Sequence, residues 1–104
     1  MCGFCGFTGQ IQNRTELLQQ MADKITHRGP DSQGVYTDDM LAMAFRRLSI
    51  IDLADGSQPM YNEDGSVVIV FNGEIYNFME LRQALTEAGH VFKTRCDTEV
   101  ILHG

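Results

Sequence analysis

MCGFCG, residues 1–6, is the stretch that decides how the whole chain is interpreted, because it places a cysteine at position 2. Removal of Met1 would make Cys2 the N-terminal residue, carrying both a thiol nucleophile and a free α-amine that can act as its base. Two other interpretations stay open from these residues alone. The first is that Cys2 and Cys5, with two residues between them, form one cysteine pair of a metal or redox site. The second is that a short strand simply contains a buried cysteine.

The metal and redox interpretations lack the residues they need. A structural zinc site normally has four ligands, commonly with a second pair at similar spacing. The remaining candidate ligands are scattered along the chain: Cys96, His27, His90 and His103. A thioredoxin-like pair lies where a helix begins after a strand, whereas a strand-like segment surrounds this pair. The sequence therefore predicts no metal in this domain.

Length and composition limit the remaining choices. The 104 residues are one domain at most, and 43% hydrophobic with 21% charged residues is ordinary for a globular protein. A net charge of -6 argues against nucleic acid and anionic membranes as partners. No apolar run reaches membrane-spanning length, and no secretion signal opens the chain. Three cysteines, an odd number, argue against a disulfide framework, so we expect a cytoplasmic protein with reduced thiols.

Local patterns in the first half predict a strand, a helix and a hairpin. We expect a strand over 2–8, then a helix capped by Asn13 with Glu16 and ending before the Gly-Pro loop of 27–31. Residues 34–37 and 41–45 predict a hairpin around two aspartates. Alternation along the second of these strands sends Arg46 and Arg47 to opposite sides, and an inward arginine needs an anion as its partner.

The second half predicts a loop and further short elements. We expect a long loop over 54–65, a strand buried on both faces over 67–71, and a short strand over 91–94. Asn77 with Glu80 predicts a capped helix that Gly89 ends, and Asp97 predicts the cap of a last helix. Asn72-Gly73 would normally form a hairpin turn, yet a helix-like segment follows it. The last helix has barely begun at Gly104, and its apolar residues Val100, Ile101 and Leu102 have nothing after them to pack on, which predicts a truncated chain.

Six motifs occur in order and together cover nearly the whole chain: MCGF (1–4), HRGPD (27–31), FRRLSIID (45–52), SQPM (57–60), FNGEIYN (71–77) and DTEVI (97–101). Together they resemble the glutaminase domain of glutamine-hydrolysing asparagine synthetases, which are class II glutamine amidotransferases. The resemblance implies an α+β fold, the αββα sandwich of N-terminal-nucleophile hydrolases with mainly antiparallel sheets. Residues 1–104 would be the N-terminal part of that domain and leave the fold incomplete.

The resemblance also implies the activity and its residues. Glutamine would be hydrolysed to glutamate and ammonia through a thioester on Cys2. Asn72 and the backbone N–H of Gly73 would form the oxyanion hole. Arg47 would bind the substrate's α-carboxylate, and Glu74 and Asp97 would hold its α-amino group. The resemblance implies no chemical role for His27 or Asp31.

Partners and cofactors follow from the same resemblance. The domain itself would need no cofactor, while ATP and magnesium would serve a C-terminal synthetase domain that makes asparagine from aspartate. Glutamine and that domain are the expected partners, and a homodimer is compatible with the family. The alternatives are an amidotransferase with another acceptor, a β-lactam synthetase-type relative, and a non-catalytic fragment or interaction module. The intact Cys2 and its set of glutamine-binding residues argue against the β-lactam synthetase type.

Overall fold

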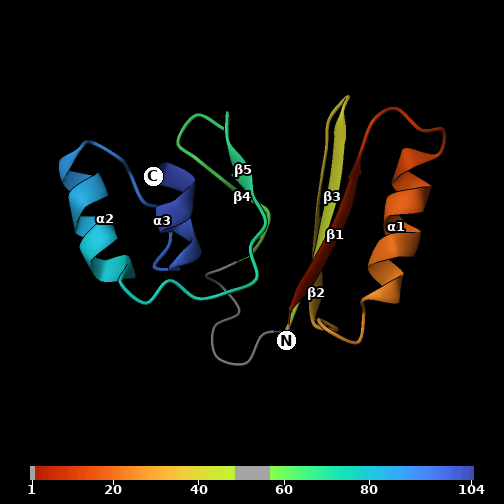
Figure 1. The fold of residues 1–104 in the computed structure, drawn as a ribbon, viewed down its shortest axis with the longest axis horizontal. Helices are drawn as coiled ribbons and strands as arrows, with labels where there is room; N and C mark the ends of the chain where they lie inside the picture. Colours follow the sequence, from red (N-terminus) through yellow and green to blue (C-terminus); the bar gives the residue numbers. More distant parts are fainter. Residues whose placement is uncertain (1, 49–56) are drawn as a thin grey trace.

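The computed structural model describes residues 2–48 and 57–104, which form an α+β fold with antiparallel sheets (Figure 1). Its elements in chain order are β1 (Gly3–Thr8), α1 (Arg14–Lys24), β2 (Ser32–Thr37), β3 (Leu41–Arg47), β4 (Met60–Tyr61), β5 (Val68–Ile69), α2 (Phe78–Glu87) and α3 (Thr98–His103). The first three strands make one sheet in the order β1-β3-β2, and β4 and β5 make a second. The α+β class expected from the sequence is confirmed.

Helix α1 covers one face of the three-stranded sheet (Figure 1). The core between them consists of the buried residues Leu18, Ala22, Ala42 and Ala44, with Cys5 and Phe7 packed against it. Three of the four buried residues are alanines, and such small side chains let the helix backbone approach the sheet closely. The strands point alternate residues to this face, as the period of two requires.

The other face of this sheet meets the β4–β5 hairpin, and α2 and α3 lie beyond it (Figure 1). Gly34 in β2 lies against the chain that leads into β4, where an added Cβ would be 1.8 Å from the carbonyl oxygen of Gln58. The rings of Tyr36 and Tyr61 also meet, with centroids 6.2 Å apart. Only glycine allows this approach of the two sheets.

Several local predictions are confirmed. The strand near the N-terminus and the hairpin of β2 and β3 form as expected, and α1 ends before the Gly-Pro loop. Gly89 follows α2 with a φ of 103°, and its N–H donates to the carbonyl oxygen of Thr86. The N–H of His90 donates to the carbonyl oxygen of Leu85, which completes a Schellman motif.

The three predicted helix caps are wrong. Asn13, Asn77 and Asp97 occupy the N-cap positions, but none makes a side-chain cap hydrogen bond. A capping side chain requires an extended backbone at the N-cap residue. Asn13 instead has left-handed angles, Asn77 lies outside the extended region, and Asp97 is already helical.

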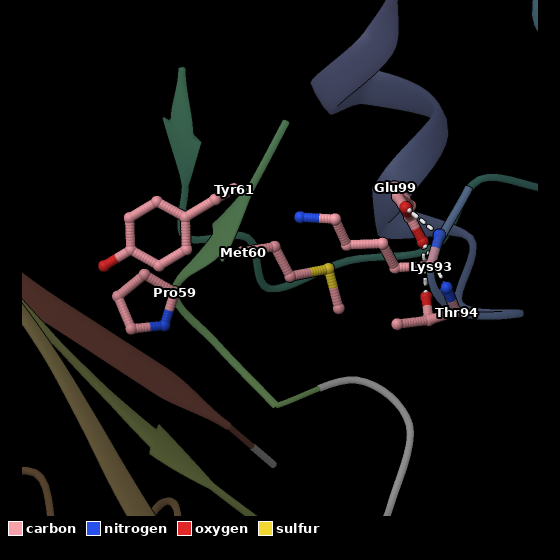
Figure 2. Close-up of a pocket in the computed structure, with 6 residues that line it drawn as sticks. All are labelled: Pro59, Met60, Tyr61, Lys93, Thr94 and Glu99. Carbon is pink, nitrogen blue, oxygen red and sulfur yellow. Dashed lines mark hydrogen bonds between the residues drawn. The ribbon is translucent and has the colours of Figure 1, made fainter. Parts of the chain in front are cut away.

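Two strand predictions also need correction. The strand expected over 67–71 and buried on both faces shrinks to β5, whose residues are half-buried, because among the described residues it pairs with β4 alone. The expected strand over 91–94 does not form. There, the N–H groups of Lys93 and Thr94 donate to the carboxylate of Glu99, at 2.7 and 2.8 Å (Figure 2), so a side chain replaces the partner strand.

The predicted loop of 54–65 is interrupted by β4, and its first part lies outside the described residues, as do Met1 and 49–52. Two of the last three apolar residues pack against elements that precede them in the chain. Val100 and Leu102 are buried where α3 packs against α2 and β4, while Ile101 is 41% exposed.

Candidate active site

A pocket of about 240 Å³ contains every site residue expected from the sequence. Its lining residues are Cys2, Phe45, Arg47, Gln58, Phe71, Asn72, Gly73, Glu74, Cys96, Asp97 and Thr98. They come from the start of β1, the end of β3, the segments before β4 and after β5, and the start of α3. Five separate stretches of the sequence thus meet at one point.

Cys2 is held in this pocket mainly through its backbone carbonyl. That oxygen accepts a hydrogen bond from Nε of Arg28 at 3.1 Å and another from Nδ2 of Asn72 at 2.9 Å. The thiol lies beside the end of β3, where the N–H of Leu48 donates to Sγ at 3.4 Å. The two carbonyl bonds fix the residue without using its thiol.

Arg28 is a functional candidate that sequence reasoning missed. It belongs to the loop of 27–31, for which the sequence predicted no chemical role. The loop is bound tightly to β3, since an added Cβ on Gly29 would lie 2.3 Å from the carbonyl carbon of Arg46, and the N–H of Asp31 donates to the carbonyl of Arg47. The available signal was an arginine next to Gly-Pro, but only the fold shows that it reaches Cys2.

The two arginines of β3 separate as strand alternation predicts. Arg46 points away from the pocket, donating to the carbonyl of Gly29 at 2.9 Å and to the side-chain oxygen of Gln33 at 2.8 Å. Arg47 lines the pocket. The arginine on the pocket side is therefore Arg47, and a planar guanidinium suits an anionic substrate group.

The segment after β5 is held by a side chain that the sequence did not single out. Gln58 binds both backbone groups of Phe71: its Oε1 accepts from the N–H at 2.5 Å, and its Nε2 donates to the carbonyl at 2.9 Å. Asn72 and Gly73 follow directly. A half-buried side chain therefore sets the backbone from which the expected oxyanion donors project.

The acidic side of the pocket is organised by Asp97. Its Oδ2 accepts the N–H of Ile75 at 2.8 Å, which ties the segment after β5 to the start of α3. Its Oδ1 lies 3.6 Å from Sγ of Cys96. Glu74 lines the same pocket and is exposed. Two carboxylates and one arginine therefore face one small cavity, a set that matches the charges of a free amino acid.

The three cysteines occupy different environments, and all have free thiols. Cys5 packs against the core under α1, on the face opposite Cys2, and burial raises the pKa of its thiol. Cys96 lines the pocket with Cys2. Cys2 and Cys5 are three positions apart, so the alternation of an extended strand sends them to opposite faces and removes Cys5 from the pocket.

Comparison with known proteins identifies the class. The glutamine amidotransferase domain family matches the chain over residues 1–104, so the chain belongs to that family.

Several similar proteins are named asparagine synthetases. The chain is 49% identical to "Asparagine synthetase [glutamine-hydrolyzing] 1" of Bacillus subtilis, over 98% of this chain and 17% of that protein. It is 47% identical to the second such protein of the same organism, over 99% of this chain and 14% of that protein, and 37% identical to a probable asparagine synthetase of Dictyostelium discoideum. The chain thus spans less than a fifth of the length of these relatives. In the part of the chain that the structure describes, no helix is long and apolar enough to cross a membrane.

Proposed function

We propose that this domain hydrolyses glutamine to glutamate and ammonia, with Cys2 as the nucleophile after removal of Met1. The observation that carries the proposal is the meeting of Cys2, an arginine, two carboxylates and the Asn72-Gly73 pair in one pocket. The relatives' names state that they hydrolyse glutamine. The layer order of Figure 1 is compatible with the αββα sandwich of N-terminal-nucleophile hydrolases, which we propose as the complete fold.

The chemistry begins with the free α-amine of Cys2 taking the thiol proton. A thiol and an α-amine have ordinary pKa values within about one unit of each other, so the transfer is almost neutral in energy. The thiolate then attacks the side-chain carboxamide carbon of glutamine, and the carbonyl oxygen becomes a tetrahedral oxyanion. Collapse of that intermediate breaks the C–N bond, the ammonium group returns the proton to nitrogen, and ammonia leaves a γ-glutamyl thioester. Water attacks the thioester, releasing glutamate and the thiol.

The oxyanion donors in this proposal are the Asn72 side chain and the N–H of Gly73. In the structure one N–H of the Asn72 amide binds the carbonyl of Cys2, and the amide group has a second N–H with which to donate. The first bond holds the donor beside the nucleophile. Losing an oxyanion donor typically costs about 3 kcal/mol of barrier, or a hundredfold or more in rate.

Substrate selection would rest on the charged residues of the pocket. Arg47 would bind the α-carboxylate of glutamine through its planar fork, and Glu74 and Asp97 would bind the α-amino group. Recognition of both groups selects free glutamine over glutamine within a peptide. Arg47→Ala should therefore raise KM more than it lowers kcat, and an unchanged KM would remove its proposed role.

The remaining proposals concern the whole protein. Ammonia would feed the ATP- and magnesium-dependent synthesis of asparagine in a synthetase domain, as the relatives' names and greater length support. The three free thiols are compatible with the reducing cytoplasm. Neither ATP nor magnesium is needed for the reaction proposed for this pocket.

The decisive experiment compares Cys2→Ala with Cys96→Ala, because both residues line the pocket. Glutamate release from glutamine should vanish in Cys2→Ala and persist in Cys96→Ala. A glutamine-mimicking electrophile should label Cys2 at one equivalent, as located by peptide mass spectrometry. Hydrolysis that survives in Cys2→Ala, or labelling at Cys96 alone, would refute the assignment.

A further inference from the structure

A second group of reactive side chains lies away from the active-site pocket. Glu63, His90 and His103 each offer a metal-ligand atom, and these three atoms lie within 4.8 Å of one another. They come from the β4–β5 turn, the segment after α2, and the last residue of α3. None of them lines the pocket of Cys2.

The two imidazoles face the same carboxylate, one on each oxygen. Nδ1 of His90 is 3.0 Å from Oε2 of Glu63, and Nδ1 of His103 is 2.7 Å from Oε1. The two rings lie near each other, with centroids 5.3 Å apart and planes inclined at 45°. Both ring nitrogens therefore point toward one small volume beside Glu63.

A buried carboxylate contacts the other ring nitrogen of His103. Nε2 of His103 lies 3.2 Å from Oε1 of Glu99, and both side chains are at most 3% exposed. Glu99 is itself fixed by Lys93 and Thr94, as Figure 2 shows. A histidine that donates one N–H to a carboxylate and presents its other nitrogen outward is the usual arrangement behind a metal ligand.

The contact between His103 and Glu63 points to a cation. Although the two atoms are 2.7 Å apart, Nδ1 of His103 is buried and has no hydrogen-bond partner among the described residues. With a proton on Nε2 toward Glu99, Nδ1 presents a lone pair beside Glu63, the form in which an imidazole binds a metal ion. The carboxylates of Glu63 and Glu99 together carry a charge of -2, which a divalent cation would balance.

We propose that Glu63, His90 and His103 form a binding site for a divalent transition-metal ion, with Zn²⁺ as the best match. Two imidazoles and one carboxylate are a known ligand set for zinc, with bonds of about 2.0–2.2 Å. Tetrahedral ligands are then about 3.4 Å apart, so the His–Glu contacts of 3.0 and 2.7 Å would lengthen around the ion, while any separation nearer the 4.8 Å limit would shorten. Glu63 and His90 are about one-third exposed and can rotate toward buried His103.

The ion would join the β4–β5 hairpin to the segment after α2 and to the end of α3. The hairpin leads directly to Asn72 and Gly73, and Asp97 precedes α3. A bound ion would thus stabilise the two elements that supply the far side of the active-site pocket. The proposal stands on the cluster's own geometry and is independent of the reaction proposed for Cys2.

The test is a titration of the chelator-treated protein with Zn²⁺ alone, followed by competition with a chromophoric chelator. We expect one ion per chain and a rise in Tm on addition of zinc. Glu63→Gln and His90→Ala should each weaken zinc binding at least tenfold, while exposed His27→Ala should not change it. Both altered side chains are partly exposed, so the variants should fold, which circular dichroism would check.

Cobalt(II) provides a second readout that separates this cluster from the cysteines. Bound at Glu63 and the histidines, Co²⁺ should give visible bands without a thiolate-to-cobalt charge-transfer band. The proposal is overturned if zinc does not bind, or if binding persists in Glu63→Gln and His90→Ala. A charge-transfer band that disappears in Cys2→Ser would place the ion at the thiols and would equally overturn it.

Discussion

Gln58 offers the sharpest test of how the fold positions the active site. Gln58→Ala removes both hydrogen bonds that hold the backbone of Phe71, at 2.5 and 2.9 Å. A buried group left without its partner costs about 1–3 kcal/mol. Because Phe71 is half-buried, water replaces part of this bonding, and we expect a total loss of about 2 kcal/mol, concentrated in the segment before Asn72.

Two measurements follow from that magnitude. The amide hydrogen of Phe71 should exchange about thirtyfold faster, since about 2 kcal/mol corresponds to that factor in an opening equilibrium. In glutamate-release assays kcat should fall roughly tenfold to a hundredfold, because Asn72 and Gly73 lose their fixed position, while KM should change little. Gln83→Ala on the exposed face of α2 is the matched control. Among the described residues, the Gln83 side chain makes a hydrogen bond only to the side chain of Glu87, one helical turn away.

The result that contradicts this reasoning is specific. Unchanged exchange at Phe71 in a folded Gln58→Ala variant would show that Gln58 does not hold this backbone. Faster exchange with unchanged kcat would show that Gln58 does hold the backbone of Phe71. It would also show that Asn72 and Gly73 are not the oxyanion donors of the reaction.

Three further predictions test the core, the nucleophile's support and the response to acid. Leu18→Ala should destabilise the fold by about 2–5 kcal/mol, because Leu18 is 2% exposed in the core between α1 and the sheet. Urea unfolding measures this loss, and a loss under about 1 kcal/mol would contradict that packing. Arg28→Ala should slow labelling of Cys2 by a glutamine-mimicking electrophile at least tenfold, and Arg14→Ala, a control outside the pocket, should not. Hydrogen bonds from the Tyr36 hydroxyl and the Met40 and Leu41 N–H groups lower the pKa of Asp38 below its usual value of 3.8. This carboxyl therefore stabilises the fold above about pH 4 and loses its contribution as the pH falls through its lowered pKa, so the stability gap between wild type and Asp38→Asn should close in acid. A gap that widens in acid would reverse the assigned sign.

The sequence predicted the elements whose cause is local. Alternation predicted that Arg46 and Arg47 lie on opposite sides, and the turn residues predicted the β2–β3 hairpin and the end of α2. These features depend on neighbours within a few positions. Only the pairing of β1 with β3 shows that Arg47 shares its side with Cys2. The six expected site residues came from motif resemblance, and their shared pocket is a property of the fold that no single motif contains.

The wrong predictions share a physical reason. Caps were assigned to Asn13, Asn77 and Asp97 from spacing, but backbone angles and longer-range bonds decide how a polar side chain is used. Asp97 binds the N–H of Ile75, twenty-two positions away, instead of its own helix. Likewise Glu99 binds the backbone of 93–94 and removes the strand expected there. Spacing within a helix could not reveal these partners.

The same limit explains why Arg28 and Gln58 were missed, although both bear on the surroundings of Cys2, the proposed nucleophile. Each acts by binding a backbone group of a distant segment, the carbonyl of Cys2 in one case and both groups of Phe71 in the other. This mode of support suits the proposed chemistry. An N-terminal nucleophile needs its amine as a base and its thiol as the attacking group, so the carbonyl is the part of Cys2 that the fold can hold firmly without blocking the reaction. Arg28 and Asn72 both bind that carbonyl.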